Sequence, residues 1–211
     1  IKLNEFKQAA SKFAYAHELR SNEPYILQRL VLATYKSKEP SELESLMQAR
    51  TLLAKLFPEE SNDPETTGLA GAIQKRLWLI TQDSVQLDKA IEYYSRGFTI
   101  KKDYYNGENL ASCLSLKSEI QSESSQTAFY ETAAKNVRLK LYDLINELIS
   151  NPDFEDRNDK KWIFATLANV CFHLGKVDEG NLNETLFLAE NIADWERNSY
   201  FDSKATIPNL E

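Results

Sequence analysis

Helix-breaking residues are scarce in this sequence. It has six prolines and six glycines among 211 residues, and no proline lies between Pro64 and Pro152. A turn-rich β-sandwich needs such residues at short intervals, so their scarcity argues against that class and favours long helices. Hydrophobic residues make up 42% of the chain and charged residues 27%, which excludes global disorder. The length suits one large domain or one repeat array.

Long apolar runs are also absent. No stretch approaches the eighteen uninterrupted apolar residues of a membrane span, and no signal peptide is visible, so we expect a cytoplasmic protein without membrane contact. The chain opens on Ile1, as a piece excised from a longer protein would. The two cysteines, Cys113 and Cys171, fit neither a metal pattern nor a disulfide framework, and we expect both in the core.

The net charge of −7 disfavours binding to long nucleic acids, but the charge is unevenly spread. Residues 71–102 carry six basic and three acidic groups, whereas residues 178–211 carry two basic and eight acidic ones. A locally basic patch in an acidic protein suits a small or discrete anionic partner. Ordinary solvated helix faces would give the same counts, and the sequence leaves that alternative open.

Apolar periodicity predicts eight helices in four antiparallel pairs and no strand. Ser41 and Asp63 have the residue types and spacing of helix N-caps, and Gly175 those of a helix end. Residues 1–21 form an N-terminal helix or linker in this interpretation, 22–193 the helical hairpins and 194–211 a C-terminal tail. The predicted helices span about 23–36, 41–57, 64–80, 84–98, 104–118, 127–149, 159–174 and 180–193.

Residues at helical spacing are expected to face the core, Leu77 and Leu141 among them. The stripes of the first three predicted helices are Leu27, Leu30, Val31 and Thr34; Leu43, Leu46, Met47, Leu53 and Phe57; and Leu69, Ile73, Leu77 and Ile80. Four hairpins of similar size predict an all-α, right-handed solenoid of about four tetratricopeptide-like hairpins, in one domain over 1–211.

Three segments carry a closer resemblance. They run from Ser61 to Trp78, from Leu87 to Phe98 with Ala90-Ile91-Glu92-Tyr93-Tyr94, and from Asp103 to Ala111. Together with residues 23–36 and 162–168, they resemble the tetratricopeptide-like sensor domain of bacterial conflict and signalling proteins. A related domain is the central regulatory, TRAF-binding region of apoptosis signal-regulating kinases. The resemblance covers roughly residues 20–200 and implies a non-enzymatic module that senses a nucleotide-derived signal or a partner.

The first helix of each hairpin lines the concave face of such a solenoid, so we take candidate ligand-binding residues from those helices. Two guanidinium groups in one groove suit phosphate geometry. An ion pair with an acid such as Glu65 is the alternative role for Arg29, Lys75 and Arg76. Core packing is the alternative to base stacking for Tyr105 and Trp162. The candidates are Arg29, Lys36, Glu65, Lys75, Arg76, Tyr105, Asn106, Asn109, Trp162 and Thr166.

No catalytic or metal-binding constellation stands out, and we expect neither an enzyme nor a cofactor. Cys171 and His173 are two residues apart on one helix, which is poor geometry for a thiolate–imidazole pair. The leading hypothesis is a sensor whose concave groove binds an anionic, nucleotide-like signal and controls an effector in a bacterial defence or signalling system. The alternatives are a scaffold that binds a peptide or partner helix in the same groove, and a module that self-associates into a homo-oligomer.

Overall fold

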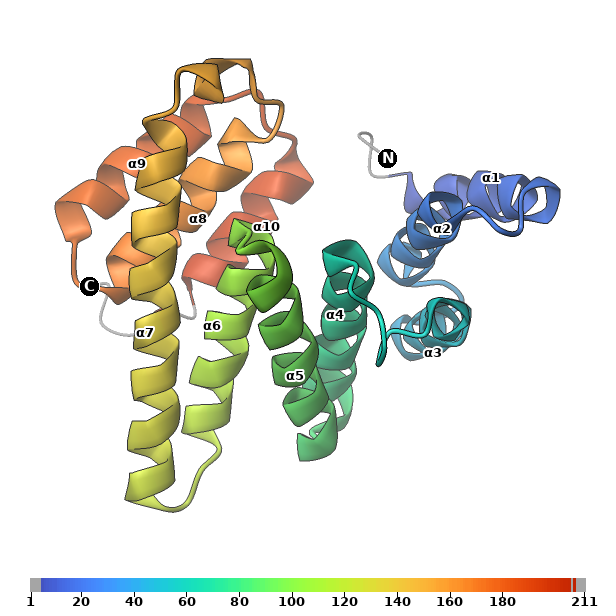
Figure 1. The fold of residues 1–211 in the computed structure, drawn as a ribbon, viewed down its shortest axis with the longest axis horizontal. Coiled ribbons are helices and arrows are strands. Elements are labelled where there is room, and N and C mark those ends of the chain that lie inside the picture. Colours follow the sequence, from blue (N-terminus) through green and yellow to red (C-terminus); the bar gives the residue numbers. More distant parts are fainter. Residues whose placement is uncertain (1–4, 206, 208–211) are drawn as a thin grey trace. The chain divides into compact units, whose positions relative to one another are not determined.

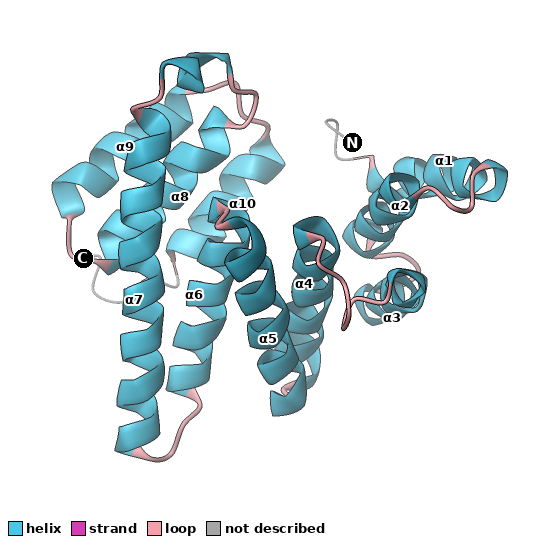
Figure 2. Ribbon diagram, viewed as in Figure 1, coloured by secondary structure: helices cyan, strands magenta, loops and turns pink. Residues whose placement is uncertain are grey.

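The computed structural model describes residues 5–205 and 207, and every regular element in that part of the chain is helical (Figure 2). The all-α prediction is therefore confirmed. None of the described helices is long and apolar enough to cross a membrane. The α-helices are α1 (Phe6–Leu19), α2 (Pro24–Ser37), α3 (Glu42–Leu53), α4 (Pro64–Thr81), α5 (Ser84–Lys101), α6 (Tyr104–Glu119), α7 (Ser124–Ile149), α8 (Lys160–His173), α9 (Val177–Ala189) and α10 (Asp194–Lys204), with short 3₁₀ helices η1 (Ala54–Leu56) and η2 (Pro152–Asp156).

The chain forms two compact units, residues 1–101 with α1–α5 and residues 102–211 with α6–α10. In the first unit α2 packs on α3 and α4 on α5, and α1 adds a further helix against α2 (Figure 1). In the second unit α6 packs on α7, and α8 packs on α9. The four predicted hairpins are present, and residues 1–21 contain a helix rather than only a linker.

The predicted helix ends follow from local hydrogen bonding. The Ser41 hydroxyl accepts the Glu44 backbone N–H at 3.2 Å, and the Asp63 carboxylate accepts the Thr66 N–H at 2.9 Å. Gly175 has a φ of 74° two residues after the end of α8, where its missing side chain permits the left-handed turn. These capping groups satisfy backbone atoms that a helix end leaves without partners.

The helix count was wrong, because the described residues contain ten α-helices rather than eight. The two additional helices are α1 and, in the tail, α10. The polar residues before position 127 also continue α7 back to Ser124. The α10 helix is anchored by Glu196, whose buried carboxylate accepts the Lys161 ammonium at 2.6 Å. Its Tyr200 ring lies 4.8 Å from that of Phe187 on α9. The acidic tail therefore folds into a helix because Lys161 pairs with Glu196 and Phe187 packs against Tyr200.

The core stripe of the second predicted helix was partly wrong. Leu46 and Leu53 are buried as predicted, whereas Leu43, Met47 and Phe57 are exposed. The α-helix ends at Leu53 and a 3₁₀ turn follows, so Phe57 no longer keeps the helical register. Ile80, the last residue of the α4 stripe, is exposed too. The expected burial of Leu77, Leu141, Cys113 and Cys171 is confirmed.

The centre of the first unit is α4, in which every residue from Thr66 to Gln74 is buried. Gly71 permits this dense packing. A Cβ atom placed there would lie 2.9 Å from three ring atoms of Tyr94, a fully buried residue of α5. The glycine that costs helix propensity is therefore a packing site for an aromatic ring.

We expect Gly71→Ala to lower the free energy of unfolding by about 1–3 kcal/mol, because the buried Tyr94 ring has no free space into which to move. Urea denaturation would measure the loss. The control is the same substitution in a Tyr94→Leu background, where the clash is relieved and the second change should cost much less. An equal cost in both backgrounds would contradict this account of Gly71.

Candidate functional site

A pair of buried polar contacts sets the position of α2 against α4. The Gln28 side-chain amide on α2 donates to the Asp63 carboxylate at 2.5 Å and to the Thr66 hydroxyl at 3.0 Å. Burial acts to raise the pKa of Asp63, but hydrogen bonds from Thr66, the Glu65 backbone and Gln28 together lower it. The ionised N-cap of α4 is thus held by a side chain of α2.

The next residue on α2, Arg29, forms an ion pair with Glu65 on α4. Its guanidinium also lies 5.4 Å from the ring centre of Tyr25. The Arg29 Nε atom is buried and has no hydrogen-bond partner. The ion-pair alternative therefore describes Arg29 in the free protein, and the pair leaves one donor of the guanidinium unsatisfied.

Two turns further along α2, Tyr35 lies against α4. The Arg76 guanidinium lies 5.0 Å from the centre of its ring, and an Arg76 Nη1–H donates to the Ala72 carbonyl at 3.1 Å. Burial raises the pKa of Tyr35, which is further affected by the charges of Arg76, Glu65 and Arg29 in that order. One buried hydroxyl therefore lies within electrostatic range of both arginines.

Lys36 completes the group. Its pKa is lowered to about 8, first by burial and then by the positive charges of Arg76 and Lys38. We refer to Arg29, Tyr35, Lys36, Glu65 and Arg76 as the α2–α4 cluster. Four of these five are predicted ligand-binding residues, and the structure brings them together. Tyr35 is the member that sequence reasoning missed, because it has the spacing of an ordinary core residue.

The order of these contacts shows how the two helices run. Gln28 and Arg29 meet the start of α4, and Tyr35 and Lys36 meet Arg76 near its end. Helices α2 and α4 are therefore parallel, as the first helices of successive hairpins must be. The cluster extends over about two turns of α2, or roughly 10 Å at 1.5 Å per residue. Such a surface can hold an extended anion with more than one charged group.

The charge on Lys36 should destabilise the free protein. Its folded pKa of about 8 lies below the reference value of 10.5, so the unfolded chain binds more protons between these values. Above pH 10.5 Lys36 is neutral in both states and the protein bears no cost for it. As the pH falls from 10.5 to about 8, this stability is lost, because only the unfolded chain gains from protonation of Lys36. After a discount for partial exposure, we expect Lys36→Met to stabilise the protein at pH 7 by about 1–2 kcal/mol.

Denaturant unfolding at pH 7 and pH 10 would test this expectation, with the advantage of the variant shrinking at the higher pH. Lys12→Met, at an exposed position on α1, is the matched control and should change little. A Lys36→Met variant less stable than the wild type at pH 7 would contradict the account.

The remaining candidate on α4, Lys75, is half-buried beside Arg76. The other five candidates lie in the second unit. On α6, Tyr105 is exposed, whereas Asn106 is buried and donates to the Asp103 N-cap at 2.9 Å. The Asn109 amide donates to the Tyr105 carbonyl one turn back. A ligand role for these α6 residues stays a prediction.

On α8, Trp162 packs within the second unit. Its ring centre lies 6.4 Å from that of Phe187 and 6.1 Å from that of Trp195. Thr166, one turn along, is buried. These contacts give Trp162 the packing role that the sequence left as its alternative.

A buried polar group joins the three helices α6, α7 and α8 in the second unit. The Arg138 guanidinium donates to the Ser115 hydroxyl at 2.9 Å and lies 3.3 Å from the His173 Nε2 atom. Burial lowers the pKa of Arg138, and the charge of Glu108 opposes that effect. Burial and the charge of Arg138 lower the pKa of His173 to about 3, which keeps the imidazole neutral and able to accept from Arg138.

This neutral histidine predicts acid sensitivity. Because its folded pKa lies below the unfolded value of about 6.5, its contribution to stability is complete above pH 6.5 and falls as the pH is lowered towards 3. We expect His173→Asn to reduce the wild-type loss between pH 7 and pH 5 by about 1–2 kcal/mol. An NMR titration checks the cause directly, and a His173 pKa near 6.5 would contradict it.

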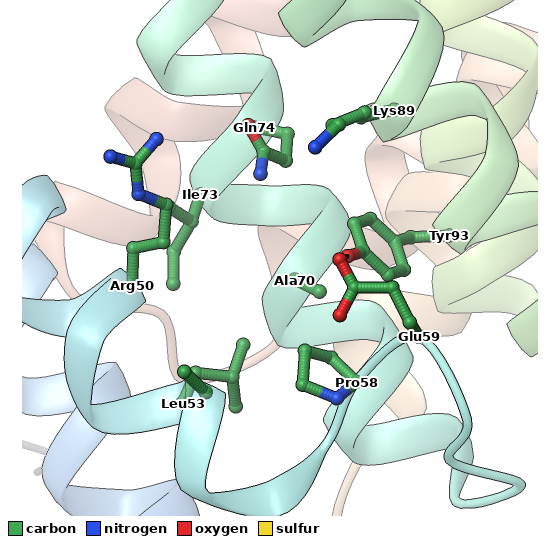
Figure 3. Close-up of a pocket in the computed structure, with 10 residues that line it drawn as sticks. Arg50, Leu53, Pro58, Glu59, Ala70, Ile73, Gln74, Lys89 and Tyr93 are labelled. Atoms are coloured by element: carbon green, nitrogen blue, oxygen red, sulfur yellow. Dashed lines mark hydrogen bonds between the residues drawn. The ribbon is translucent and has the colours of Figure 1, made fainter.

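Sequence reasoning also missed a cavity of about 210 Å³ in the first unit. It lies among α3, the segment after it, α4 and α5, and it contains polar side chains from Arg50, Gln74 and Lys89 (Figure 3). The candidates were sought on the first helices of the hairpins, whereas α3 and α5 are second helices. The two small residues that open the space, Ala54 and Ala70, give no signal in the sequence.

Comparison with known families identifies the fold. The family model described as Tetratricopeptide Repeats-Sensor matches residues 5–114, just over half of the chain. The chain belongs to this family. The match begins at the residue before α1 and ends within α6, so the N-terminal helix is part of the sensor domain. Searches of curated proteins and of solved structures find no match.

Membership confirms the predicted resemblance to a tetratricopeptide-like sensor domain over residues 5–114, and the extension of that resemblance to about residue 200 stays a prediction. The α2–α4 cluster lies entirely within the matched residues, as does the cavity next to α3 and α5. The family description specifies neither a ligand nor an effector.

Proposed function

We propose that this protein is a non-enzymatic sensor whose α2–α4 cluster binds an anionic, nucleotide-derived ligand. In this proposal binding controls an attached or associated effector in a bacterial defence or signalling system. The observation that carries it is the gathering of three cations, with Arg29 and Arg76 in electrostatic range of Tyr35 and Lys36 in range of Arg76, at a cost that appears as the lowered pKa of Lys36. A phosphate group would remove that cost because it favours the charged form of the lysine.

The cluster offers different chemistry at its two ends. Lys36 and Arg76 lie together, where an ammonium and a guanidinium can share one phosphate group. At the other end, Tyr25 is 61% exposed beside Arg29. An exposed aromatic ring of this kind can stack on a nucleobase. A ligand with phosphates at one end and a base at the other would use both.

Glu65 gives the site a means of responding. In the free protein its carboxylate holds Arg29, and it lies two residues after the N-cap that Gln28 contacts. A ligand phosphate that draws Arg29 away from Glu65 changes the link between α2 and α4. The ligand can shift the protein only by its difference in affinity for the two arrangements, and this exchange of ion pairs supplies such a difference.

The experiment is a calorimetric titration of the whole chain with ADP-ribose, NAD, ATP and inorganic pyrophosphate. At least one nucleotide should bind, and Arg76→Gln and Lys36→Met should each weaken it about tenfold or more, by the loss of a charged hydrogen bond. Affinity in the wild type should fall as the pH rises through 8, because Lys36 then loses its charge. Lys36→Met should remove that pH dependence.

Lys12→Met is again the control and should leave binding unchanged. Arg76→Gln must also keep the melting temperature of the ligand-free wild type, or the loss of binding would reflect damage to the fold. Failure of every nucleotide to bind would overturn the proposal. Competition by a peptide or partner helix at the same residues would instead support the scaffold function.

A further inference from the structure

Helix α10 contacts the last hairpin through one of its faces. Glu196, Tyr200 and Lys204 follow one another at intervals of four residues, so they share a face that turns by about 40° at each step. Each of the three has a partner on α8 or α9. Anchors at this spacing are typical of a helix that binds in the groove of another protein.

The first anchor is acidic. The Glu196 carboxylate accepts a hydrogen bond from the Lys161 ammonium of α8 at 2.7 Å, and another from the Ala193 backbone N–H at 2.9 Å. Only 9% of the Glu196 side chain is exposed, so water screens this ion pair little. The residue that caps the start of α10 also attaches it to α8, and helix formation and docking are therefore linked.

The other two anchors are an aromatic ring and a base. The buried Tyr200 ring lies 4.8 Å from the ring of Phe187 on α9. The Lys204 ammonium pairs with the Glu184 carboxylate of α9 at 2.6 Å, and it lies 4.5 Å from the ring centre of Phe172 on α8. The last turn of α10 is thus held by charge and by an aromatic face.

We call Lys161, Phe172, Glu184 and Phe187 the α10 seat. Its basic residue meets the start of the bound helix and its acidic residue meets the end. A helix docked in the opposite direction would bring two ammonium groups together at one end and two carboxylates at the other. The seat therefore selects the direction of a helix as well as its composition.

The seat is deeply packed, whereas its occupant is held at few points. Every residue of α8 from Ala165 to Phe172 is buried. The buried residues of α10 are Glu196 and Tyr200, and Ile207 adds one apolar contact after the helix. Residues 190–193, which lead into α10, lie outside the helices. An eleven-residue helix is marginal by itself in water, so α10 depends on the seat and should open before α8 does.

The geometry points to the α10 seat as a docking site for a helix of a partner protein, which displaces α10. That helix has an acidic residue, an aromatic residue and a lysine or arginine at positions i, i+4 and i+8. Well-packed apolar anchors would hold a permanent cap at least as firmly as the ion pairs do, whereas charged anchors select a partner. Displacement also uncovers the ring of Trp162, 6.1 Å from that of Trp195 on α10, as further contact area.

A labelled peptide of residues 193–205 tests the site in the full chain, with binding followed by fluorescence anisotropy. The wild-type protein should bind it weakly, because the tethered α10 competes at a high effective concentration. In the protein, Glu196→Lys brings two ammonium groups together and releases α10. This variant should bind the peptide about tenfold or more tightly than the wild type, because its seat is open.

The opposite reversal, Lys161→Glu, releases α10 as well and changes the charge that the peptide meets. This protein should prefer a peptide with Glu196→Lys to the unchanged one by about tenfold, whereas the Glu196→Lys protein should prefer the unchanged peptide. In both proteins, Tyr200→Ala in the preferred peptide should weaken binding about tenfold or more. Asp202→Lys, the same reversal as Glu196→Lys at an exposed position of α10, is the control and should leave the seat closed.

Hydrogen exchange of the wild-type protein checks the opening without a substitution. The α10 amides should exchange through an opening that leaves α8 protected. This result, together with opposite peptide preferences in the two variants, would support the site. Protection of α10 equal to that of α8 would overturn the proposal, as would peptide binding by neither folded variant or the same preference in both.

Two further measurements separate this site from its alternatives. Sedimentation of the wild type should show monomers, and a dimer that Glu196→Lys dissociates would mean that the seat takes the α10 of a second copy. That result would overturn the assignment to a partner protein. Lys36→Met should leave peptide binding unchanged, because no residue of the seat belongs to the α2–α4 cluster, and a change would contradict a separate site.

Discussion

The contact between Gly71 and the Tyr94 ring controls how closely α4 and α5 approach. A fully buried aromatic ring can lie on a helix at this distance only where the helix has no side chain, and one methyl group would bring atoms to 2.9 Å. The close approach buries α4 continuously from Thr66 to Gln74. A helix buried in this way is held on several sides, so the polar groups it carries are fixed in direction.

The residues of α4 take part in two groups, the α2–α4 cluster and the lining of the cavity. Glu65 and Arg76 are directed towards α2, whereas Gln74 lines the cavity next to α3 and α5. Arg76 and Gln74 are two residues apart, which is about 200° around an α-helix. Neighbouring polar residues near the end of one helix thus belong to chemically different surfaces, one with three cations and one with a buried amide. Both depend on the packing at Gly71.

The helices were predictable because their signals are local. Apolar spacing and caps such as Asp63 and Gly175 gave four hairpins, all of them observed. The α2–α4 cluster was largely predictable too, since arginine and lysine on parallel first helices must share a face. The tail helix α10 was not predictable, because it is held by residues far away in the sequence, as in the ion pair of Glu196 with Lys161. The cavity was not predictable either, since its lining joins α4, two second helices and a loop that come together only in three dimensions.

The charges around each cation of the first unit indicate whether that cation has a structural or a binding role. Arg29 already has a carboxylate partner in Glu65, and such an arginine contributes to a fold with or without a ligand. Lys36 differs, because burial first and then the positive charges of Arg76 and Lys38 lower its pKa. A lysine placed there for stability alone would be better replaced by an apolar residue of the same length. Its retention is explained if an anion arrives to share the positive charge, and the energy stored in the free protein then becomes affinity for that anion.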